Sequence, residues 1–447
     1  MGDVEKMLKD GQSRVRFHMP GHMGRIPLGQ YDTTELASTD DLHQPTGPYA
    51  RLQERFAAKN GAQASFLLVG GSTLGVQAML LACLRPGDAL LLPRSAHVSA
   101  WSACVIGGFR PQCIYPTYDA ERGLAPYREE DVLAAMEQTP DARALLLVRP
   151  DYYGRCLPLE RIARRAREKG MLLLVDEAHG AHLPFLQAGP RPAGALGADL
   201  WCQSLHKTLP ALTQTAVLHL RDARQAPRVR AALRLLETSS PSSLLLLSAE
   251  KALDWMERWG GERLEWLAER ISRLEQELDG RYRLCRFANM DPTRLVLDVR
   301  GTGNSGYAVA RWLAEAGVDM EMADDLRLVG IPSVMSREED FACLAAALGR
   351  LTGSGQVQPP KAALRYGQPC MDLREAFFCE KRLLPLERAA GQICGAAFGP
   401  YPPGEPLAVP GERISPALVQ GLLDALERGC GSFGITNKGE VSCVIAP

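Results

Sequence analysis

A lysine lies directly after a histidine, and three residues after a serine, in the stretch QSLHKTLPAL at residues 203–212. The preceding residues 199–204, DLWCQS, are typical of a strand, so Lys207 is expected just past a strand end. Ligands of open α/β sheets bind at such ends. A buried lysine becomes less basic and can form a Schiff base with an aldehyde. Taken alone, Lys207 is more simply explained as a surface lysine on a loop.

An aspartate follows a second predicted strand in the same way. The apolar residues 171–175 lead into Asp176 in the stretch MLLLVDEAHG. A carboxylate there faces the ligand crevice and could keep a pyridine nitrogen protonated; the alternative is a capping or loop aspartate. The letters DEAH also occur in a helicase nucleotide motif, but that motif needs an upstream phosphate loop with a lysine, and the stretch 70–76 has none.

Two further stretches could hold parts of a ligand. In LLVGGSTLGVQAML a strand runs into Gly70-Gly71, then Ser72 and Thr73, then a helix. Glycines, hydroxyls and a helix N-terminus suit a phosphate, although an ordinary N-cap by Ser72 or Thr73 explains the pattern equally well. His97, in PRSAHVSAW, follows the predicted strand ALLLP and could stack on a flat ring. A lone histidine is nevertheless more often structural.

Strands and helices that could position these residues alternate through the first half of the chain. This alternation predicts a mostly parallel α/β sheet buried on both faces. A helix is also predicted in GPYARLQERFAAKNG at 47–61, with Gly61 as its stop. The predicted strands are 64–70, 89–93, 113–116, 144–150, 171–178, 199–204 and 215–220, and the predicted helices between them are 73–84, 97–107, 128–137 and 158–169.

The remaining segments have different patterns. Residues 1–30 are predicted to be an irregular arm, because HMPGHMG places proline and glycine close together. A long helical region is expected at 242–278, followed by a smaller α/β unit with a helix near 306–316. Residues 353–369 are rich in Gly, Pro and Gln and read as a linker before a third unit at 370–447.

Composition excludes several classes of function. The chain has 447 residues, which favours two or three domains. Lys plus Arg is 51 and Asp plus Glu is 52, so a net charge of -1 gives no electrostatic case for nucleic acid or an acidic membrane surface. Twelve scattered cysteines without a C-x-x-C pattern favour free thiols in a reducing cytosol over disulfides or zinc. Neither a secretion signal nor a membrane span is predicted, so we expect a cytoplasmic protein.

The candidate groups occur in a meaningful order. A phosphate cradle, a histidine, an aspartate and a lysine each follow a strand, with 31 residues from Asp176 to Lys207 (207 − 176). This is the order of groups in fold-type I enzymes that use pyridoxal 5'-phosphate (PLP). PLP brings the phosphate, the pyridine ring and the aldehyde that these residues suit.

The sequence resembles one family in particular, the Orn/Lys/Arg decarboxylases of fold type I, in the short form without an N-terminal wing domain. The resemblance covers almost the whole chain in order, and HKTLPALTQTAVLH together with YPPG…PGE is specific to this family. The other matching segments are FHMPGH, STDDLHQPTGPYARLQE, GGSTLGVQAM, RSAHVSAWSA, PDYYG and VDEAHGAH.

The resemblance implies a fold and an assembly. It implies an aspartate-aminotransferase-like large domain with a mostly parallel seven-stranded sheet, a smaller α/β domain and a C-terminal α+β domain. It also implies a homodimer or higher homo-oligomer with the site at the dimer interface. The implied segments are an arm at 1–30, the PLP-binding large domain at 31–258, the small domain at 259–352, the linker at 353–369 and the C-terminal decarboxylase domain at 370–447.

The resemblance also assigns roles to residues. Lys207 would form the Schiff base, Asp176 would pair with the pyridine nitrogen, and His97 would stack on the ring. His179 would lie beside the ring near its phenolic oxygen. The phosphate would be bound by Ser72, Thr73, Ser204 and His206.

Four positions depart from the usual family pattern. Met23 stands where a basic residue is usual, and Leu205 where a small hydroxyl residue is usual. Leu183-Pro184 replaces an aromatic residue or glycine, and Glu405 replaces an apolar residue in PPGxP. None of these changes removes a catalytic group, but Leu205 affects the predicted phosphate contacts and Glu405 the choice of substrate.

The implied reaction is decarboxylation of lysine, arginine or ornithine to the amine and CO2, and hence polyamine or diamine formation. A dibasic substrate needs acceptors for its distal cation. Each candidate has a simpler explanation as a solvated surface carboxylate. These candidates are Asp40, Asp41, Glu321, Glu405 and Glu412.

Other readings remain open at this stage. The same cofactor residues would serve an aminotransferase, an aldolase, a lyase acting on sulfur amino acids, or a non-catalytic relative. Gly301, Gly303 and Gly306 match the dinucleotide fingerprint of nicotinamide oxidoreductases. The pair His179 and His182 could bind a metal only on a helix, as could the pair at 18 and 22, which proline and glycine interrupt, so no metal is predicted.

Overall fold

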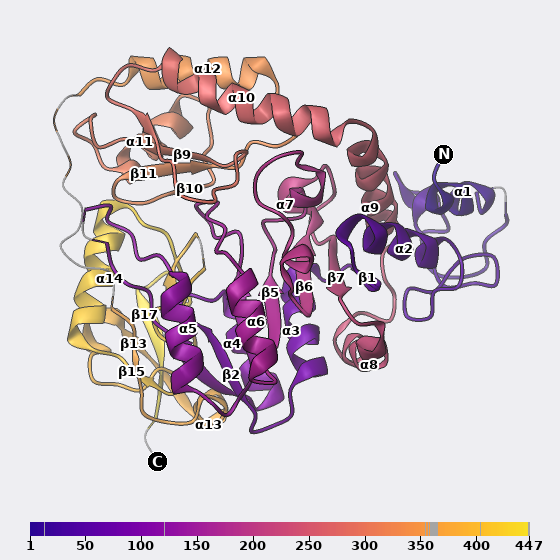
Figure 1. Ribbon diagram of the computed structural model, residues 1–447, viewed down its shortest axis with the longest axis horizontal. Helices are drawn as coiled ribbons and strands as arrows, with labels where there is room; N and C mark the ends of the chain where they lie inside the picture. The colour runs from indigo at the N-terminus through magenta and orange to yellow at the C-terminus, as the bar shows by residue number, and fades with distance from the viewer. Residues whose placement is uncertain are drawn as a thin grey trace. The chain divides into compact units, whose positions relative to one another are not determined.

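The computed structural model describes residues 1–12, 14–119, 121–353, 355, 357, 365–402 and 404–445. The fold is dominated by a seven-stranded sheet with the strand order β1-β7-β6-β5-β4-β2-β3 (Figure 1). Most of its neighbouring strands are parallel, which confirms the predicted fold class. Contacts divide the chain into two compact units, which are residues 1–84, 144–267 and 333–335, and residues 85–143, 268–332 and 336–447.

The first unit holds most of the sheet and the helices that cover it. Its elements are α1 (Asp3–Asp10), α2 (Pro48–Asn60), β1 (Ala64–Leu68), α3 (Gly71–Cys83), β4 (Ala142–Val148), α6 (Glu160–Glu168), β5 (Leu172–Asp176), β6 (Leu200–Ser204), α7 (Leu205–Thr208), β7 (Ala216–Leu220), α8 (Ala226–Leu236), α9 (Ser243–Trp255), a π-helical turn (Met256–Gly260) and the start of α10 (Gly261–Glu277). The predicted strands and helices of this region are confirmed.

The second unit contains two further strands of the large sheet and several smaller sheets. Its elements are β2 (Ala89–Pro93), α4 (Val98–Gly107), β3 (Arg110–Ile114), α5 (Glu129–Gln138), β8 (Arg283–Leu284), β9 (Leu295–Asp298), α11 (Gly306–Glu315), β10 (Met322–Ala323), β11 (Arg327–Gly330), α12 (Glu338–Arg350), β12 (Gln368–Pro369), α13 (Leu373–Phe378), β13 (Lys381–Pro385), β14 (Gly399–Pro400), β15 (Glu412–Arg413), α14 (Pro416–Arg428), β16 (Ser432–Phe433) and β17 (Glu440–Val444). Most of the predicted linker, residues 354, 356 and 358–364, lies outside the described residues.

Strand directions in the first unit bring several chain segments to one edge of the sheet. β4, β5 and β6 are parallel, and β7 runs antiparallel to both β6 and β1. The carboxyl ends of β1, β5 and β6 therefore lie at the same edge. Helix α3 packs on β6 and β7, and α2 packs on β1 and β7 (Figure 1). Residues that follow β1, β5 and β6 can consequently meet.

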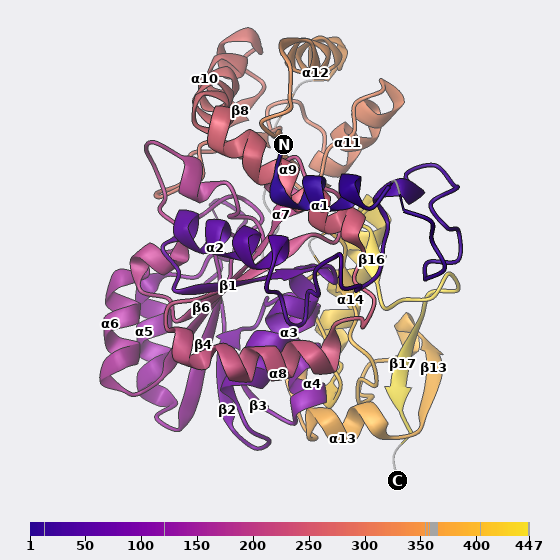
Figure 2. The ribbon, with the colours of Figure 1, turned by 90° about the vertical axis from the view of Figure 1, so that its right-hand side faces the viewer.

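The N-terminal segment contains a helix, so the prediction of an irregular arm is wrong for residues 3–10. Val4, Met7 and Leu8 are buried, a spacing that gives α1 one apolar face. The carboxylate of Glu250 accepts the N–H groups of Val4 (2.7 Å) and Glu5 (2.9 Å) at the start of the helix. Helices α1, α2 and α9 lie side by side (Figures 1 and 2). This long-range cap from α9 was not visible in the local sequence.

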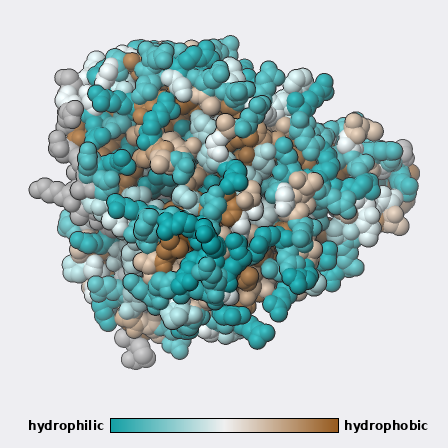
Figure 3. Space-filling model, in the orientation of Figure 1, coloured by the Kyte–Doolittle hydropathy of each residue, from teal (hydrophilic) through white to brown (hydrophobic). Residues whose placement is uncertain are grey.

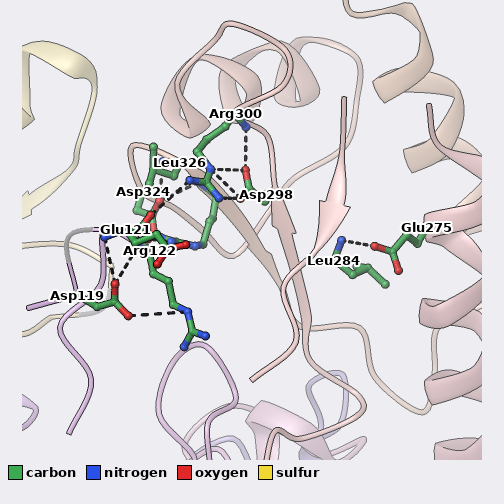
Figure 4. A network of polar contacts seen from close by, with 10 residues as sticks. Asp119, Glu121, Arg122, Glu275, Leu284, Asp298, Arg300, Asp324 and Leu326 are labelled. Carbon is green, nitrogen blue, oxygen red and sulfur yellow. Dashed lines mark hydrogen bonds and ion pairs between the residues drawn. The ribbon is translucent and has the colours of Figure 1, made fainter. Parts of the chain in front are cut away.

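The small sheet of the second unit has the order β10-β11-β9-β8, and its pairs are antiparallel. Polar contacts fix the loops at its end, as Figure 4 shows. Arg300 pairs with Asp298 (2.7 Å), and Asp324 accepts the N–H of Leu326 (2.7 Å).

The dinucleotide interpretation of Gly301, Gly303 and Gly306 is wrong. A dinucleotide site requires neighbouring parallel strands joined by the helix, whereas β9 and β10, which precede and follow α11, are separated in the sheet by the antiparallel β11. The glycines serve close packing instead: a Cβ at Gly306 would overlap the carbonyl oxygen of Asp324, and one at Gly301 would lie 2.6 Å from that of Arg281.

None of the helices in the described part of the chain combines the length and the apolar character that a membrane span requires. On the face shown in Figure 3, hydrophobic residues are interspersed with hydrophilic ones.

Candidate active site

Lys207 lies on the single-turn helix α7, directly after β6 (Figure 1). Its Nζ atom is 3.2 Å from Nε2 of His179, which follows β5. The ring of Tyr152 meets the ring of His179 edge-on, with 4.8 Å between centroids. Lys207 is half-buried and has a partner that can share a proton. The explanation as a solvated loop lysine is therefore wrong.

Asp176 is the last residue of β5 and is nearly buried. Its Oδ1 atom accepts the N–H of Ala178 (3.1 Å). Both Asp176 and Lys207 act electrostatically on Cys202 of β6: burial raises the pKa of the thiol, the carboxylate raises it further, and the ammonium lowers it. The carboxylate and the amine thus share one neighbourhood at the ends of β5 and β6.

Two serine hydroxyls meet at the start of α3. Ser204, the last residue of β6, donates its hydroxyl to that of Ser72 (2.7 Å). The N-cap of α3 is Gly70 and has no side-chain cap, so capping by Ser72 or Thr73 is not their role. Gly71 has φ of +72°, which favours glycine. Hydroxyls and helix N–H groups at this end are the groups that bind phosphate.

His206 follows Ser204 by two residues and lies on the same short helix as Lys207. Its Nδ1 atom is 3.2 Å from the carbonyl oxygen of Thr215. Because a carbonyl only accepts, Nδ1 carries the proton. Burial lowers the pKa of His206, and the charge of Lys207 lowers it further. With Nδ1 already protonated, Nε2 can donate to a phosphate only when the ring carries a second proton. A bound phosphate would therefore have to raise the pKa of His206.

His97 belongs to the second unit. It is the N-cap of α4 and accepts the N–H of Ser99 (3.2 Å). A Cβ added to Gly404, the last residue of YPPG, would lie 3.6 Å from Cδ2 of His97, so this glycine lies beside the His97 ring. The cap explains the position of His97 without a ligand, and its stacking on a cofactor ring stays a prediction.

The predicted substrate-binding acids differ in surroundings. Asp41 of the first unit is half-buried and accepts the N–H of His43 (2.8 Å). Asp40 beside it is buried and caps the start of α2. It accepts the N–H groups of Thr46 (3.0 Å), Gly47 (3.0 Å) and Tyr49 (2.8 Å).

The other acids belong to the second unit. Glu321 is exposed and Glu405 is half-buried. Burial raises the pKa of both Tyr127 and Tyr366, and the charge of Glu405 raises each further. Glu405 thus lies near enough to two phenols for its charge to act on both.

Glu412 is engaged in a buried ion pair instead. Its Oε2 atom lies 2.7 Å from Nη2 of Arg94 and accepts the N–H of Val409 (3.0 Å). Arg94 is fully buried and also donates to the carbonyl oxygens of Pro406 (2.6 Å) and Leu407 (3.0 Å). These contacts give Glu412 a structural role: together with Arg94 it fixes the segment 406–412.

Sequence reasoning missed several residues around the site. Tyr152 stands in PDYYG, but nothing local indicated its contact with His179. Glu177 directly follows Asp176, and Gln203 directly precedes Ser204, so their places at two strand ends were a usable signal. Among the described residues, no group of three or more His, Cys, Asp or Glu could hold a metal ion.

Comparison with known proteins shows which family and fold this chain resembles. A family model described as the Orn/Lys/Arg decarboxylase major domain matches residues 9–293. An arginine decarboxylase of Bacillus anthracis is 30% identical over 93% of this chain and 90% of its own length. A lysine decarboxylase of Pseudomonas aeruginosa is 22% identical over 93% of this chain and 74% of its own length. The structure of the constitutive lysine decarboxylase of Escherichia coli matches with a TM-score of 0.81 and 18% identity, over 99% of this chain and 82% of that one.

Proposed function

Because the chain belongs to the Orn/Lys/Arg decarboxylase family, we propose that it is a PLP-dependent enzyme that removes the α-carboxylate of L-arginine or a closely related basic amino acid. The observation that carries the proposal is the contact of Lys207 with His179, in the same unit as Asp176 and the Ser72–Ser204 pair. The family resemblance implies that these groups hold the cofactor.

The residues present fit PLP. The hydroxyls of Ser72 and Ser204, with Thr73 and the start of α3, would hold the phosphate. Lys207 supplies an amine for the aldehyde. Asp176 supplies a carboxylate for the pyridine nitrogen. His206 would add a donor to the phosphate, and His97 would flank the ring, as the family resemblance implies.

The protein contributes orientation and proton control. PLP, when bound, supplies an electron sink for the bond to the substrate carboxylate. Asp176 would keep a proton on the pyridine nitrogen of bound PLP, because a nearby negative charge favours the protonated form. Nε2 of His179 lies within reach of Nζ of Lys207 and can take or return a proton there. Burial of Asp176 excludes water from its carboxylate.

Arginine is the first substrate to test. The relative named arginine decarboxylase is 30% identical and similar in length, whereas the relative named lysine decarboxylase is 22% identical. The distal guanidinium needs a carboxylate partner. Glu405 is the preferred candidate because it is half-buried beside two phenols, with Asp41 and Glu321 as further candidates. Glu412 is the least suitable, because Arg94 already pairs with it.

A decarboxylation panel tests the proposal. Purified protein with PLP is given L-arginine, L-lysine or L-ornithine separately, and CO2 and the matching amine are quantified. Release of agmatine and CO2 from arginine alone would establish the reaction and its substrate. Absence of CO2 from all three, with PLP bound, would overturn decarboxylation of basic amino acids while leaving the cofactor site intact. A homodimer and a polyamine product remain predictions from the family resemblance.

A further inference from the structure

A chain of four buried polar side chains crosses the sheet of the first unit. Ser65 of β1 contacts Nδ1 of His219 on β7 (2.7 Å), and Nε2 of His219 contacts Oε1 of Gln203 on β6 (3.1 Å). Nε2 of Gln203 then donates to Oε2 of Glu177, which directly follows β5 (2.8 Å). All four residues are nearly or fully buried. We call Ser65, His219, Gln203 and Glu177 the polar relay.

The hydrogen bonds of the relay have one consistent direction. Asn60 donates to the carbonyl of Phe56 (3.1 Å), which turns its Oδ1 toward Gln203 (2.9 Å). The oxygens of Asn60 and Glu177 both face the amide nitrogen of Gln203, so its oxygen must face His219. Burial lowers the pKa of His219 to about 3, so the ring is neutral. Its Nε2 therefore carries the proton, and its Nδ1 accepts from Ser65.

Glu177 ends the relay as an acceptor. Besides the amide of Gln203, its Oε1 atom accepts the N–H of Ala193 (2.7 Å) and lies 3.5 Å from Nη1 of Arg149. A buried carboxylate with these partners contributes little net stability compared with an apolar core. The relay is therefore better explained by the positions of the strand ends that it holds in place than by a gain in the free energy of unfolding.

The relay lies directly behind the candidate cofactor residues. Glu177 follows Asp176, and Gln203 precedes Ser204. Successive side chains of a strand point to opposite faces, so Gln203 points away from the face on which Ser204 meets Ser72. The bond between Glu177 and Gln203 thus ties together the ends of β5 and β6 from behind.

We propose that Glu177 is a positioning residue, which acts through Gln203 to hold Asp176 and Ser204 in the arrangement that binds PLP. This inference rests on the proposed cofactor site. It concerns the strength with which the apoprotein binds PLP, and not the choice of substrate.

An exchange of the two partners tests the inference. The variants are Glu177→Gln, Gln203→Glu and the double variant, and the measurement is titration of each apoprotein with PLP by absorbance. In Glu177→Gln the new amide nitrogen faces a donor, either the amide of Gln203 or the N–H of Ala193. In Gln203→Glu two carboxylates face each other. Each single variant should therefore weaken PLP binding by about tenfold or more. The double variant restores an amide facing a carboxylate and should recover part of the affinity, because the oxygen of Asn60 then faces the new carboxylate. Rescue of this kind is not expected from a residue that only fills space.

A matched control uses the opposite end of the same strands. Asp199, just before β6, accepts the N–H of Leu173 of β5 (2.9 Å) and is also nearly buried. Asp199→Asn should lower the melting temperature without changing PLP affinity. If Glu177→Gln does not fold, Ser65→Ala at the other end of the relay provides a milder variant, with a smaller loss of affinity expected.

The possible failures are distinguishable. Wild-type protein that binds no PLP would overturn the proposed function and the inference together. Wild-type protein that binds PLP, with single variants that bind it equally well, would overturn the inference alone. Weakened single variants without recovery in the double variant would overturn it as well.

Discussion

Nζ of Lys207 lies 3.2 Å from Nε2 of His179, although the two residues follow different strands, β6 and β5. An amine and an imidazole at this distance share a proton, since one must donate and the other accept. His179 can thus change the protonation of Lys207, the residue expected to hold the cofactor.

Replacement of His179 by phenylalanine tests this pair. His179→Phe keeps a ring against Tyr152 but removes Nε2, so we expect PLP to bind while kcat falls by about 10²- to 10⁴-fold. Decarboxylation rates and PLP titration measure the two effects separately. Lys207→Ala is the reference for complete loss of turnover. A His179→Phe enzyme with near wild-type kcat would exclude a proton-transfer role for this histidine.

The hydroxyl pair Ser72–Ser204 should act on the phosphate. Ser72→Ala and Ser204→Ala should each weaken PLP binding by about tenfold, because each removes one donor. The two hydroxyls contact each other, so the double variant should lose less than the product of the single effects. Pyridoxal, which lacks the phosphate, is the control ligand, and its affinity should be unchanged. Equal losses for PLP and pyridoxal would place the serines away from the phosphate.

Glu177 should make stability depend on pH. Burial raises its pKa from 4.5 to about 7, against the opposing charge of Arg149, while the charge of Asp176 raises it. Between about pH 4.5 and 7 the folded chain binds the proton that the unfolded chain has lost, so the free energy of unfolding falls as pH rises.

Comparison of Glu177→Gln with wild type isolates this effect. The variant cannot ionise, so its stability relative to wild type should increase from pH 5 to pH 8, by on the order of 3 kcal/mol at most. Urea unfolding at each pH measures the difference. A difference that stays constant over this interval would show that Glu177 does not titrate there.

The ion pair of Arg94 and Glu412 should matter for stability. Glu412→Ala would leave a fully buried guanidinium without its carboxylate, so we expect a loss of about 3–5 kcal/mol in the free energy of unfolding. Glu160→Ala removes a partner of Arg191 from an exposed pair and should cost about 0–1 kcal/mol. Similar costs for both variants in urea unfolding would contradict the structural role assigned to Glu412.

Local sequence was sufficient for the strands and for much of the site. Apolar runs bounded by Gly, Pro and polar residues predicted a strand for each of the seven in the large sheet, although β3 begins three residues before its predicted start at 113. Asp176 could be placed at a strand end because a run of apolar residues stops directly before it, and Lys207 because the strand-like stretch 199–204 ends three residues before it. Helix α1 was missed, because its apolar face is only two turns long and its cap comes from Glu250 far along the chain.

The sequence by itself therefore determined the alternation of elements, the family, and which residues stand at strand ends, because these depend on residue types at short spacing. Only the tertiary structure decided which of these residues meet. The antiparallel β7 lies between β1 and β6 and brings Ser72 to Ser204, and pairing of β9 with β11 excludes the dinucleotide interpretation of the glycines. The physical reason is that strand order and direction are set by burial over the whole chain, whereas the pattern within a strand is set by its own side chains.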